Sequence, residues 1–222
     1  MNVRVARGLD GARRVTGHTV IVDVFRAFTT AAFCVAAGAR EIVLLGDHEQ
    51  ALSLKRDDPS LFLTGEIGGR PIAGFDVGNS PSAIEHLDLS GRRVVQRTSS
   101  GTQGVVAATS AREIVLGSFV VAEATVRYLA ARADDVSIVA MGTNGADPND
   151  EDDACADYLA RRLAGERPDV AAIIARLWDD EDPSWPEWFP RRDAELACDV
   201  DRFDFAMPVS REKGLFVARP VR

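Results

Sequence analysis

An aspartate and an arginine stand close together after an apolar run in VIVDVFRAFTT, residues 20–30. The run before Asp23 has the β-branched pattern of a buried strand, and Arg26 falls where a helix is expected to begin. Ligands of open α/β sheets collect at the carboxyl ends of strands, and helix N-termini attract anions. Asp23 and Arg26 can therefore hold a cation and an oxyanion side by side. The alternative is structural, with Asp23 as a helix cap and Arg26 in a surface ion pair.

The segment GEIGGRPIAGFDVGNSP, residues 65–81, is rich in glycine and proline and is too long for an ordinary connection. Glycines let the backbone approach a ligand closely, and Glu66, Asp76, Asn79 and Ser80 offer oxygen ligands or hydrogen bonds. Asn79, Ser80 and the proline after them also match the start of a helix. A structured surface loop is the alternative interpretation.

Hydroxyl residues follow the predicted strand RRVVQ in RTSSGTQG, residues 97–104. Hydroxyl and backbone N–H donors at a helix start suit a phosphate. The donors expected here are Thr98, Ser99, Ser100, Gly101 and Thr102. No Gly-Lys-Ser/Thr follows, which disfavours nucleotide hydrolysis by a P-loop mechanism. A plain hydroxyl-rich helix cap is the alternative.

Acidic residues gather at the start of another predicted helix, in GTNGADPNDEDDACADYL, residues 142–159. They can simply favour the positive end of the helix dipole. They can also face the same cleft as Asp23, in which case Glu151 and Asp152 would coordinate a hard divalent ion. Both interpretations stay open from the sequence alone.

Alternating strand and helix patterns must bring these segments together. Strands are predicted at residues 18–24, 41–45, 61–64, 92–97, 112–116 and 136–141. Helices are predicted at residues 28–37, 48–55, 102–109, 120–133 and 151–163. The fold class is therefore α/β, with a largely parallel or mixed sheet flanked by helices. We expect one domain over residues 1–222, with a small C-terminal subdomain from about residue 168 left open, and a hairpin or two edge strands near the end.

Composition narrows the class of partner. The chain has 222 residues, 46% of them apolar, and a formal net charge of −8. An acidic chain without a Lys/Arg run repels polyanions, so nucleic acid is not an expected partner. No apolar run approaches the length of a membrane span, and the N-terminus lacks a secretory pattern, so we expect a cytoplasmic protein that does not enter membranes. The three cysteines have no metal-binding spacing and are expected to be small packing residues.

Four motifs in order resemble the 2-phosphosulfolactate phosphatase (ComB) family. They are DVFRAFTT at 23–30, GFDVGNSP at 74–81, TSSGT at 98–102 and EDDACA at 151–156. The resemblance covers about residues 18–165. It implies a ComB-like α/β phosphatase fold and a Mg²⁺-dependent hydrolase that removes phosphate from 2-phosphosulfolactate to give sulfolactate, a step toward coenzyme M. The family pattern has an arginine where this chain has Ile67 and an asparagine where it has Ser100. The expected substrate is therefore 2-phosphosulfolactate or a related small phosphorylated hydroxy acid.

A mechanism follows from the residue types. Mg²⁺ is expected on Asp23 with one or two of Glu66, Glu151 and Asp152, and it would offset charge during phosphoryl transfer. Arg26 and the donors at 98–102 would hold the remaining phosphate oxygens, with Asn79 and Ser80 as further substrate contacts. Two routes are open, direct attack by water or a covalent step on Asp23.

Other classes of function compete with this mechanism. A haloacid-dehalogenase type of phosphatase would need a second acid at the position of Phe25. A non-catalytic module that binds small phosphorylated or sulfonated acids is the main alternative. A third interpretation makes the Trp-rich tail a protein-contact surface. The sequence leaves open whether the chain forms a homo-oligomer.

Overall fold

A mixed sheet runs through the centre of the molecule. The computed structural model describes residues 1–146, 150–178, 185–186 and 189–222. Within them, the sheet has eleven strands. They are β1 (Asn2–Arg7), β2 (Gly17–Val22), β3 (Glu41–Leu45), β4 (Phe62–Ile67), β5 (Arg70–Pro71), β6 (Val77–Gly78), β7 (Arg93–Arg97), β8 (Ala111–Gly117), β9 (Asp135–Ala140), β10 (Met207–Glu212) and β11 (Leu215–Ala218). The predicted α/β class is confirmed.

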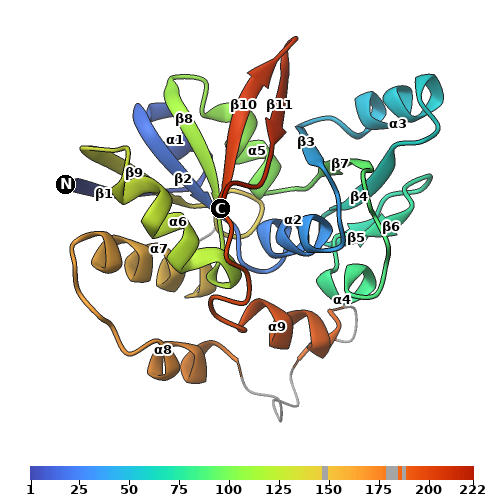
Figure 1. Ribbon diagram of the computed structural model, residues 1–222. Coiled ribbons are helices and arrows are strands. Elements are labelled where there is room, and N and C mark those ends of the chain that lie inside the picture. Colours follow the sequence, from blue (N-terminus) through green and yellow to red (C-terminus); the bar gives the residue numbers. More distant parts are fainter. Residues whose placement is uncertain (147–149, 179–184, 187–188) are drawn as a thin grey trace.

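The helices flank this sheet on its two faces (Figure 1). They are α1 (Gly8–Arg14), α2 (Ala27–Ala36), α3 (His48–Asp57), α4 (Pro81–Ile84), α5 (Gly101–Ala107), α6 (Ala122–Ala130), α7 (Asp150–Leu163), α8 (Val170–Leu177) and α9 (Arg191–Ala197), with one 3₁₀ turn at Phe119–Val121. No described helix is both long enough and apolar enough to cross a bilayer.

Two parallel blocks of strands make up the sheet, and the C-terminal hairpin joins them. The strand order is β1-β9-β2-β8-β10-β11-β3-β7-β4-β5, with β6 beside β4. Parallel pairing holds β1, β9, β2 and β8 together in one block and β3, β7, β4 and β6 in the other. In the first block, Val20 of β2 lies between Val115 and Ile138. All three side chains are buried, as expected for strands covered on both faces.

The hairpin β10–β11 lies in the middle of the sheet. The sequence had predicted either a hairpin or two edge strands for this part of the chain. It is antiparallel to β8 on one side and to β3 on the other. Lys213 and Gly214 form the turn, both with positive φ (50° and 82°), the geometry that matches the twist of a two-residue hairpin. Arg219 Nη2 donates to Glu41 Oε2 over 2.6 Å and ties β11 to β3. Of the two predicted alternatives, the hairpin is therefore confirmed and the pair of edge strands is wrong.

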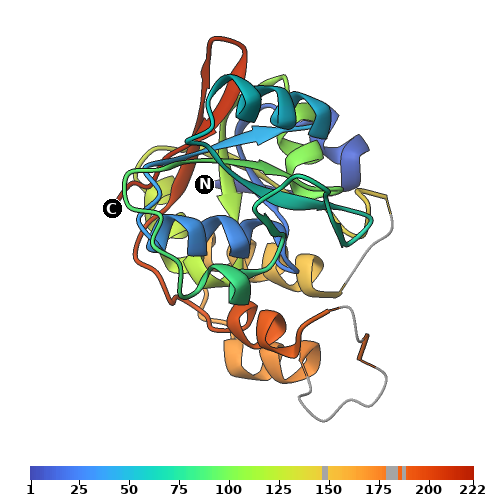
Figure 2. The ribbon, with the colours of Figure 1, turned by 90° about the vertical axis from the view of Figure 1, so that its right-hand side faces the viewer.

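The direction of the two blocks bears on the site. Three successive antiparallel pairings separate β8 from β3, so the blocks run in opposite senses along the sheet. On a flat sheet their carboxyl ends would lie at opposite edges. The sheet turns instead, and Figure 2 shows β3 and β7 lying across the direction of β8. This turn brings the segments after β2 and β7 together.

Helix α2 is buried and packs against the elements around it. Every residue from Ala27 to Cys34 is buried, and the helix contacts β3, α4 and α5. Phe28 is fully buried in the largest apolar cluster. Burying a side chain of this size stabilises the fold by roughly 1.5–3 kcal/mol. The start of α2, directly after Asp23 and Arg26, is thus fixed in the interior.

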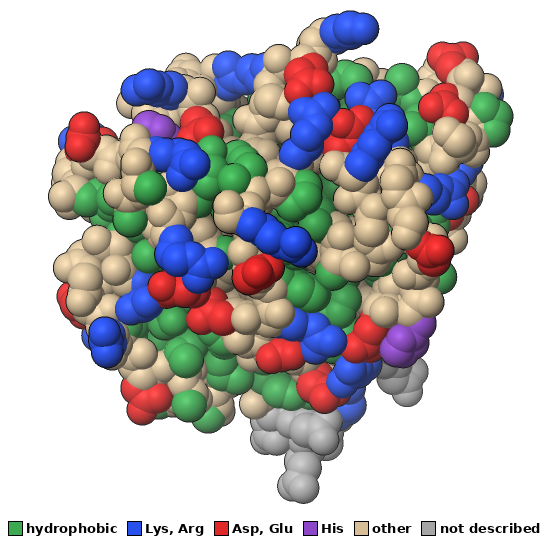
Figure 3. Space-filling model, viewed as in Figure 1, with side chains coloured by type: hydrophobic (Ala, Val, Ile, Leu, Met, Phe, Trp, Pro, Cys, Tyr) green, Lys and Arg blue, Asp and Glu red, His purple; other side chains and the backbone are tan. Residues whose placement is uncertain are grey.

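Charged side chains cover the outside in mixed sign. Figure 3 shows Lys/Arg and Asp/Glu groups interspersed over one face of the molecule. Many of them form ion pairs, for example Arg192 with Glu85 and Lys55 with Asp76. Exposed pairs of this kind each contribute about 0–1 kcal/mol, so the apolar core provides most of the stability.

Candidate active site

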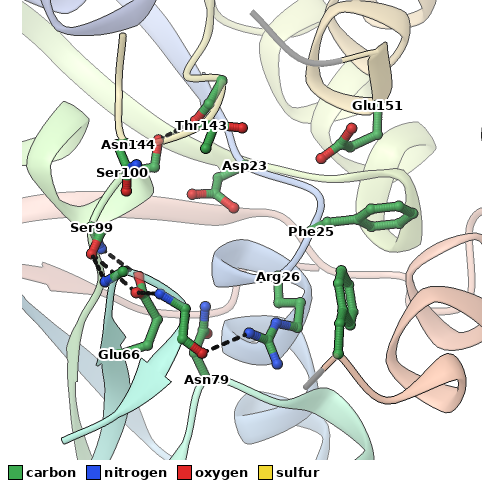
Figure 4. Close-up of a pocket in the computed structure, with 14 residues that line it drawn as sticks. Asp23, Phe25, Arg26, Glu66, Asn79, Ser99, Ser100, Thr143, Asn144 and Glu151 are labelled. Carbon is green, nitrogen blue, oxygen red and sulfur yellow. Dashed lines mark hydrogen bonds between the residues drawn. The ribbon is translucent and has the colours of Figure 1, made fainter. Parts of the chain in front are cut away.

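One cavity of about 330 Å³ collects side chains from all four sequence motifs. It is lined by Asp23, Phe25, Arg26, Glu66, Gly68, Gly69, Asn79, Ser99, Ser100, Gly142, Thr143, Asn144, Glu151 and Phe189. Figure 4 shows Asp23 near the middle, with Glu66 and Ser99 on one side and Glu151 on another. The four motifs, predicted to share one cleft, do meet there.

Asp23 stands at the carboxyl end of β2 and holds two chain segments. Its Oδ1 accepts the amide of Ala27 over 3.0 Å, and its Oδ2 accepts the amide of Gly101 over 2.7 Å. Burial raises the pKa of Asp23 to about 6, with the negative charge of Glu66 acting in the same direction and the two hydrogen bonds acting in the opposite one. Asp23 therefore accepts the first amide of α2, although the N-cap position is Arg26, and it also lines the cavity. Each carboxylate oxygen keeps a second lone pair for a ligand.

Asp152 lies directly behind this wall of the cavity. Its side chain is 1% exposed, and its two oxygens accept the amides of Val24, over 2.7 Å, and Gly142, over 3.0 Å. Burial, with the charges of Asp23 and Glu151, raises its pKa well above the ordinary range. Asp152 therefore joins the loops after β2 and β9 and does not line the cavity.

Glu66 and Ser99 form a second junction, between β4 and the loop after β7. Glu66 Oε1 accepts the amide of Ser99 over 2.5 Å, and Oε2 accepts its hydroxyl over 3.0 Å. The amide of Gly69 also donates to Oε2, over 2.7 Å. Glu66 is buried and still lines the cavity. Its carboxylate thus fixes the glycine turn and the hydroxyl loop around the cavity.

The hydroxyl loop divides into two parts. Ser99 and Ser100 line the cavity, and Ser100 Oγ donates to the Gly142 carbonyl over 2.5 Å. Thr98 and Thr102 are buried and bond to each other, with the Thr102 amide donating to Thr98 Oγ1 over 3.1 Å. Thr98, Gly101 and Thr102 are not among the lining residues. They shape the loop from behind.

The side chains of Asn79 and Ser80 lie in different places. Asn79 is buried and lines the cavity. Ser80 caps α4, where its Oγ accepts the Ala83 amide over 3.4 Å, and it donates to Asp193 Oδ1 over 2.8 Å. Asp76, considered as a further oxygen ligand because it lies in the same segment, is turned toward Lys55 and the Leu63 amide. Of this segment, Glu66 and Asn79 are the predicted side chains that reach the cavity.

Arg26 forms the wall opposite the hydroxyl loop. It is 8% exposed, and the Phe25–Arg26 peptide bond is cis. Its Nη1 donates to Asp193 Oδ2 over 3.2 Å, and its Nη2 donates to the Gly69 carbonyl over 3.3 Å, drawn in Figure 4. The guanidinium lies over the Phe189 ring, 4.6 Å from its centre. Arg26 is therefore a fixed, buried cation rather than a surface ion pair.

Glu151, in the first turn of α7, points into the cavity toward Asp23 (Figure 4). Burial raises its pKa to about 7, and the nearby charges of Asp23 and Asp150 act in the same direction. A carboxyl group with such a pKa exchanges protons near neutral pH. Residues 147–149 of the acidic motif lie outside the described residues.

Several lining residues were absent from the predicted site. Thr143 and Asn144 follow β9 at the same sheet end as Asp23, so the strand pattern could have indicated them. Phe25 and Phe189 form an aromatic wall with ring centres 5.6 Å apart, and Trp185 packs against both. Phe189 and the buried Asp193 come from the tail, where no motif points to them. Asp179–Asp182 and Trp188 lie outside the described residues.

The fold and the site together define an α/β protein with a buried, acidic cleft that contains one fixed arginine. A model of the family described as 2-phosphosulpholactate phosphatase matches residues 7–193. The chain belongs to this family, and the resemblance seen in its motifs is confirmed.

Similar proteins carry the same description. A protein of Deinococcus radiodurans is 41% identical over 128 residues, which is 57% of this chain and 53% of that protein. One of Caldicellulosiruptor saccharolyticus is 36% identical over 158 residues, 69% and 65% of the two chains. One of Bacillus subtilis is 33% identical over 156 residues, 69% and 67%. Each is named a probable 2-phosphosulfolactate phosphatase. The matched part thus spans between about half and two thirds of these relatives.

Proposed function

We propose that this chain is a phosphoric monoester hydrolase that releases inorganic phosphate from 2-phosphosulfolactate or a related small phosphorylated hydroxy acid. Family membership supports the reaction class. The observation that carries the proposal is the convergence of Asp23, Glu66, Glu151 and Arg26 on one cavity. Carboxylates for a cation beside a guanidinium for an oxyanion are what phosphoryl transfer needs.

The donor set in the cavity fits Mg²⁺. Asp23, Glu66 and Glu151 all line the cavity. Burial and the charges of neighbouring acids raise the pKa values of Asp23 and Glu151, so a cation bound beside them would favour their charged forms. Among the described residues, no three acidic, His or Cys side chains are close enough to enclose a bare ion. Mg²⁺ commonly binds through one or two carboxylates and completes its shell with waters and substrate phosphate. Asp23 and Glu151 would hold it, and Glu66 lies near enough to contribute charge.

Magnesium bound there would polarise the phosphate and offset the charge that develops in the transition state. The chain's own residues do the rest. Arg26 receives an anionic group of the substrate from a fixed position, and Glu151 accepts or donates a proton near neutral pH. Phe25 and Phe189 shield this end of the cavity from water and so strengthen these interactions. Asp23 attacks phosphorus itself or orients the attacking water.

Cavity size and charge limit the substrate. A volume of about 330 Å³ is at the small end of ligand sites, which run from roughly 300 to 1,000 Å³. It suits a compact phosphoacid better than a nucleotide or a polymer. The net charge of −8 acts against polyanions as well.

A phosphate-release screen tests the proposal. Purified protein is incubated with 2-phosphosulfolactate and a panel of phosphorylated hydroxy acids, with Mg²⁺ or with excess chelator. We expect release from at least one of these substrates with Mg²⁺ and loss of release with chelator. Release that is unaffected by chelator would overturn the metal role. Tight substrate binding with no release under any condition would support a non-catalytic binding module instead.

A further inference from the structure

Asp193 is a buried carboxylate in the C-terminal part of the chain that contacts Arg26 of the cleft. It lies in α9, and its side chain is 0% exposed. Its Oδ2 accepts from Arg26 Nη1 over 3.2 Å. Its Oδ1 accepts from three groups, the Ser80 hydroxyl (2.8 Å), the Ser82 amide (3.0 Å) and the Ser82 hydroxyl (2.6 Å). One carboxylate therefore connects the arginine of the cleft with the start of α4.

The two oxygens of Asp193 have separate tasks. Oδ1 is occupied by donors of the α4 start, which fixes the carboxylate in one orientation. Oδ2 is thereby directed at Arg26 Nη1, while Arg26 Nη2 donates to the Gly69 carbonyl. A charged pair with both members buried is stable only when further hydrogen bonds satisfy it. The Ser80 and Ser82 donors supply those bonds.

Arg26 needs such a fixed partner in order to act on a substrate. A long side chain loses rotational freedom when it binds, and a preorganised group loses less. Asp193, the Gly69 carbonyl and the Phe189 ring hold the guanidinium from three chain segments. Asp193 alone among these three carries a charge opposite to that of Arg26.

We propose that Asp193 is a positioning residue, which sets the orientation of Arg26 so that the guanidinium receives the anionic group of the substrate. The inference rests on the proposed function and deepens it, because it names the residue on which the arginine depends. It also explains how α9, far from the motifs in sequence, contributes to the cleft.

A purely structural role would make Asp193 only a link between α4 and α9. A second link between the same helices exists at the surface, where Arg192 Nη2 bonds Glu85 Oε1 over 2.7 Å. Arg192 is 45% exposed and does not line the cavity. Arg192→Ala therefore removes a link between α4 and α9 without touching Arg26, and serves as the matched control.

The experiment combines a double-mutant cycle with the control. Asp193→Asn, Arg26→Ala, the double variant and Arg192→Ala are compared with the wild type. KM and kcat for 2-phosphosulfolactate are measured with Mg²⁺. The dissociation constant of inorganic phosphate is measured by calorimetry, which needs no turnover. Thermal unfolding shows which variants are folded.

We expect Asp193→Asn to raise KM and to weaken phosphate binding about tenfold, because the Asn amide presents a donor to the guanidinium. In the Arg26→Ala background the same change should alter either constant less than about twofold. Arg192→Ala should leave both constants within about twofold of the wild type, at a lowered melting temperature.

The positioning role would be overturned if Asp193→Asn weakened phosphate binding equally in the wild type and in Arg26→Ala. It would also be overturned if Arg192→Ala weakened phosphate binding as much as Asp193→Asn does. If Asp193→Asn does not fold, Arg26→Lys decides, because lysine keeps the charge but lacks the planar fork that Asp193 orients. Phosphate binding by Arg26→Lys equal to the wild type would then contradict the inference, and weakened binding would support it. A wild type that binds phosphate but hydrolyses none of the substrates would refute the proposed function, while the binding cycle would still test Asp193.

Discussion

The Asp23 carboxylate accepts the Gly101 amide over 2.7 Å, although the two residues follow strands in different blocks of the sheet. This bond joins the first motif to the third across the turn of the sheet. Both segments are buried at that point. The cleft therefore depends on a close approach of backbone to carboxylate.

Gly101→Ala tests this approach. A Cβ at residue 101 would lie 2.8 Å from Asp23 Oδ2 and 2.9 Å from the Phe28 ring. The carboxylate would have to move, so we expect a loss of phosphate release and a destabilisation of about 1–3 kcal/mol. Gly46→Ala is the matched control, since its nearest neighbour would be a flexible Gln103 atom at 3.4 Å. The free energy of unfolding in denaturant and the rate of phosphate release are measured for both variants. Wild-type behaviour of Gly101→Ala would show that the contact is dispensable.

Asp152→Ala tests the junction behind the cavity. The change leaves the buried amides of Val24 and Gly142 without their acceptor. Each unsatisfied amide costs about 1–3 kcal/mol, so the midpoint of unfolding should move to a clearly lower urea concentration. Asp153→Ala, next in the chain, removes a partly exposed ion pair with Arg7 and should cost less than about 1 kcal/mol. Equal effects of the two changes would contradict the structural role of Asp152.

The stability of the metal-free protein should depend on pH in an unusual direction. Burial raises the pKa of Asp23 to about 6 and that of Glu151 to about 7, above the ordinary values of 3.8 and 4.5. The folded state therefore binds more protons than the unfolded state between these limits, and stability falls as pH rises from about 4 to about 7. Melting temperatures in chelator across this range should decline. Glu151→Gln should flatten the decline, and a rising curve in the wild type would refute the raised pKa values.

Much of the fold was predictable because the central strands are continuous apolar runs. β3 was predicted with its observed ends, and β2, β7, β8 and β9 were displaced by one or two residues at most. β1 was missed because none of its residues is fully buried, most are exposed, and two are arginines. The central place of β10–β11 depends on pairing with strands far away in sequence, which local patterns do not encode.

The site was predictable where residues follow strands directly. Asp23, Glu66, Ser99 and Ser100 lie at or just after strand ends, and all four line the cavity. Thr98 and Asp152 share those motifs, but their side chains turn behind the wall, and a sequence pattern does not give side-chain direction there. Asp193 could not be found, because a lone aspartate in a short helix has no spacing that connects it with Arg26.

The most direct test of the account compares the wild type with Asp23→Asn. Phosphate release from 2-phosphosulfolactate is measured with Mg²⁺, and folding is checked by thermal unfolding. Asparagine keeps the size of the side chain and one acceptor oxygen, but its NH2 group replaces the acceptor of either the Ala27 or the Gly101 amide. We therefore expect a folded protein that is less stable by about 1–3 kcal/mol and has lost turnover. Retention of more than about a tenth of the wild-type rate by the folded variant would contradict the central place given to Asp23.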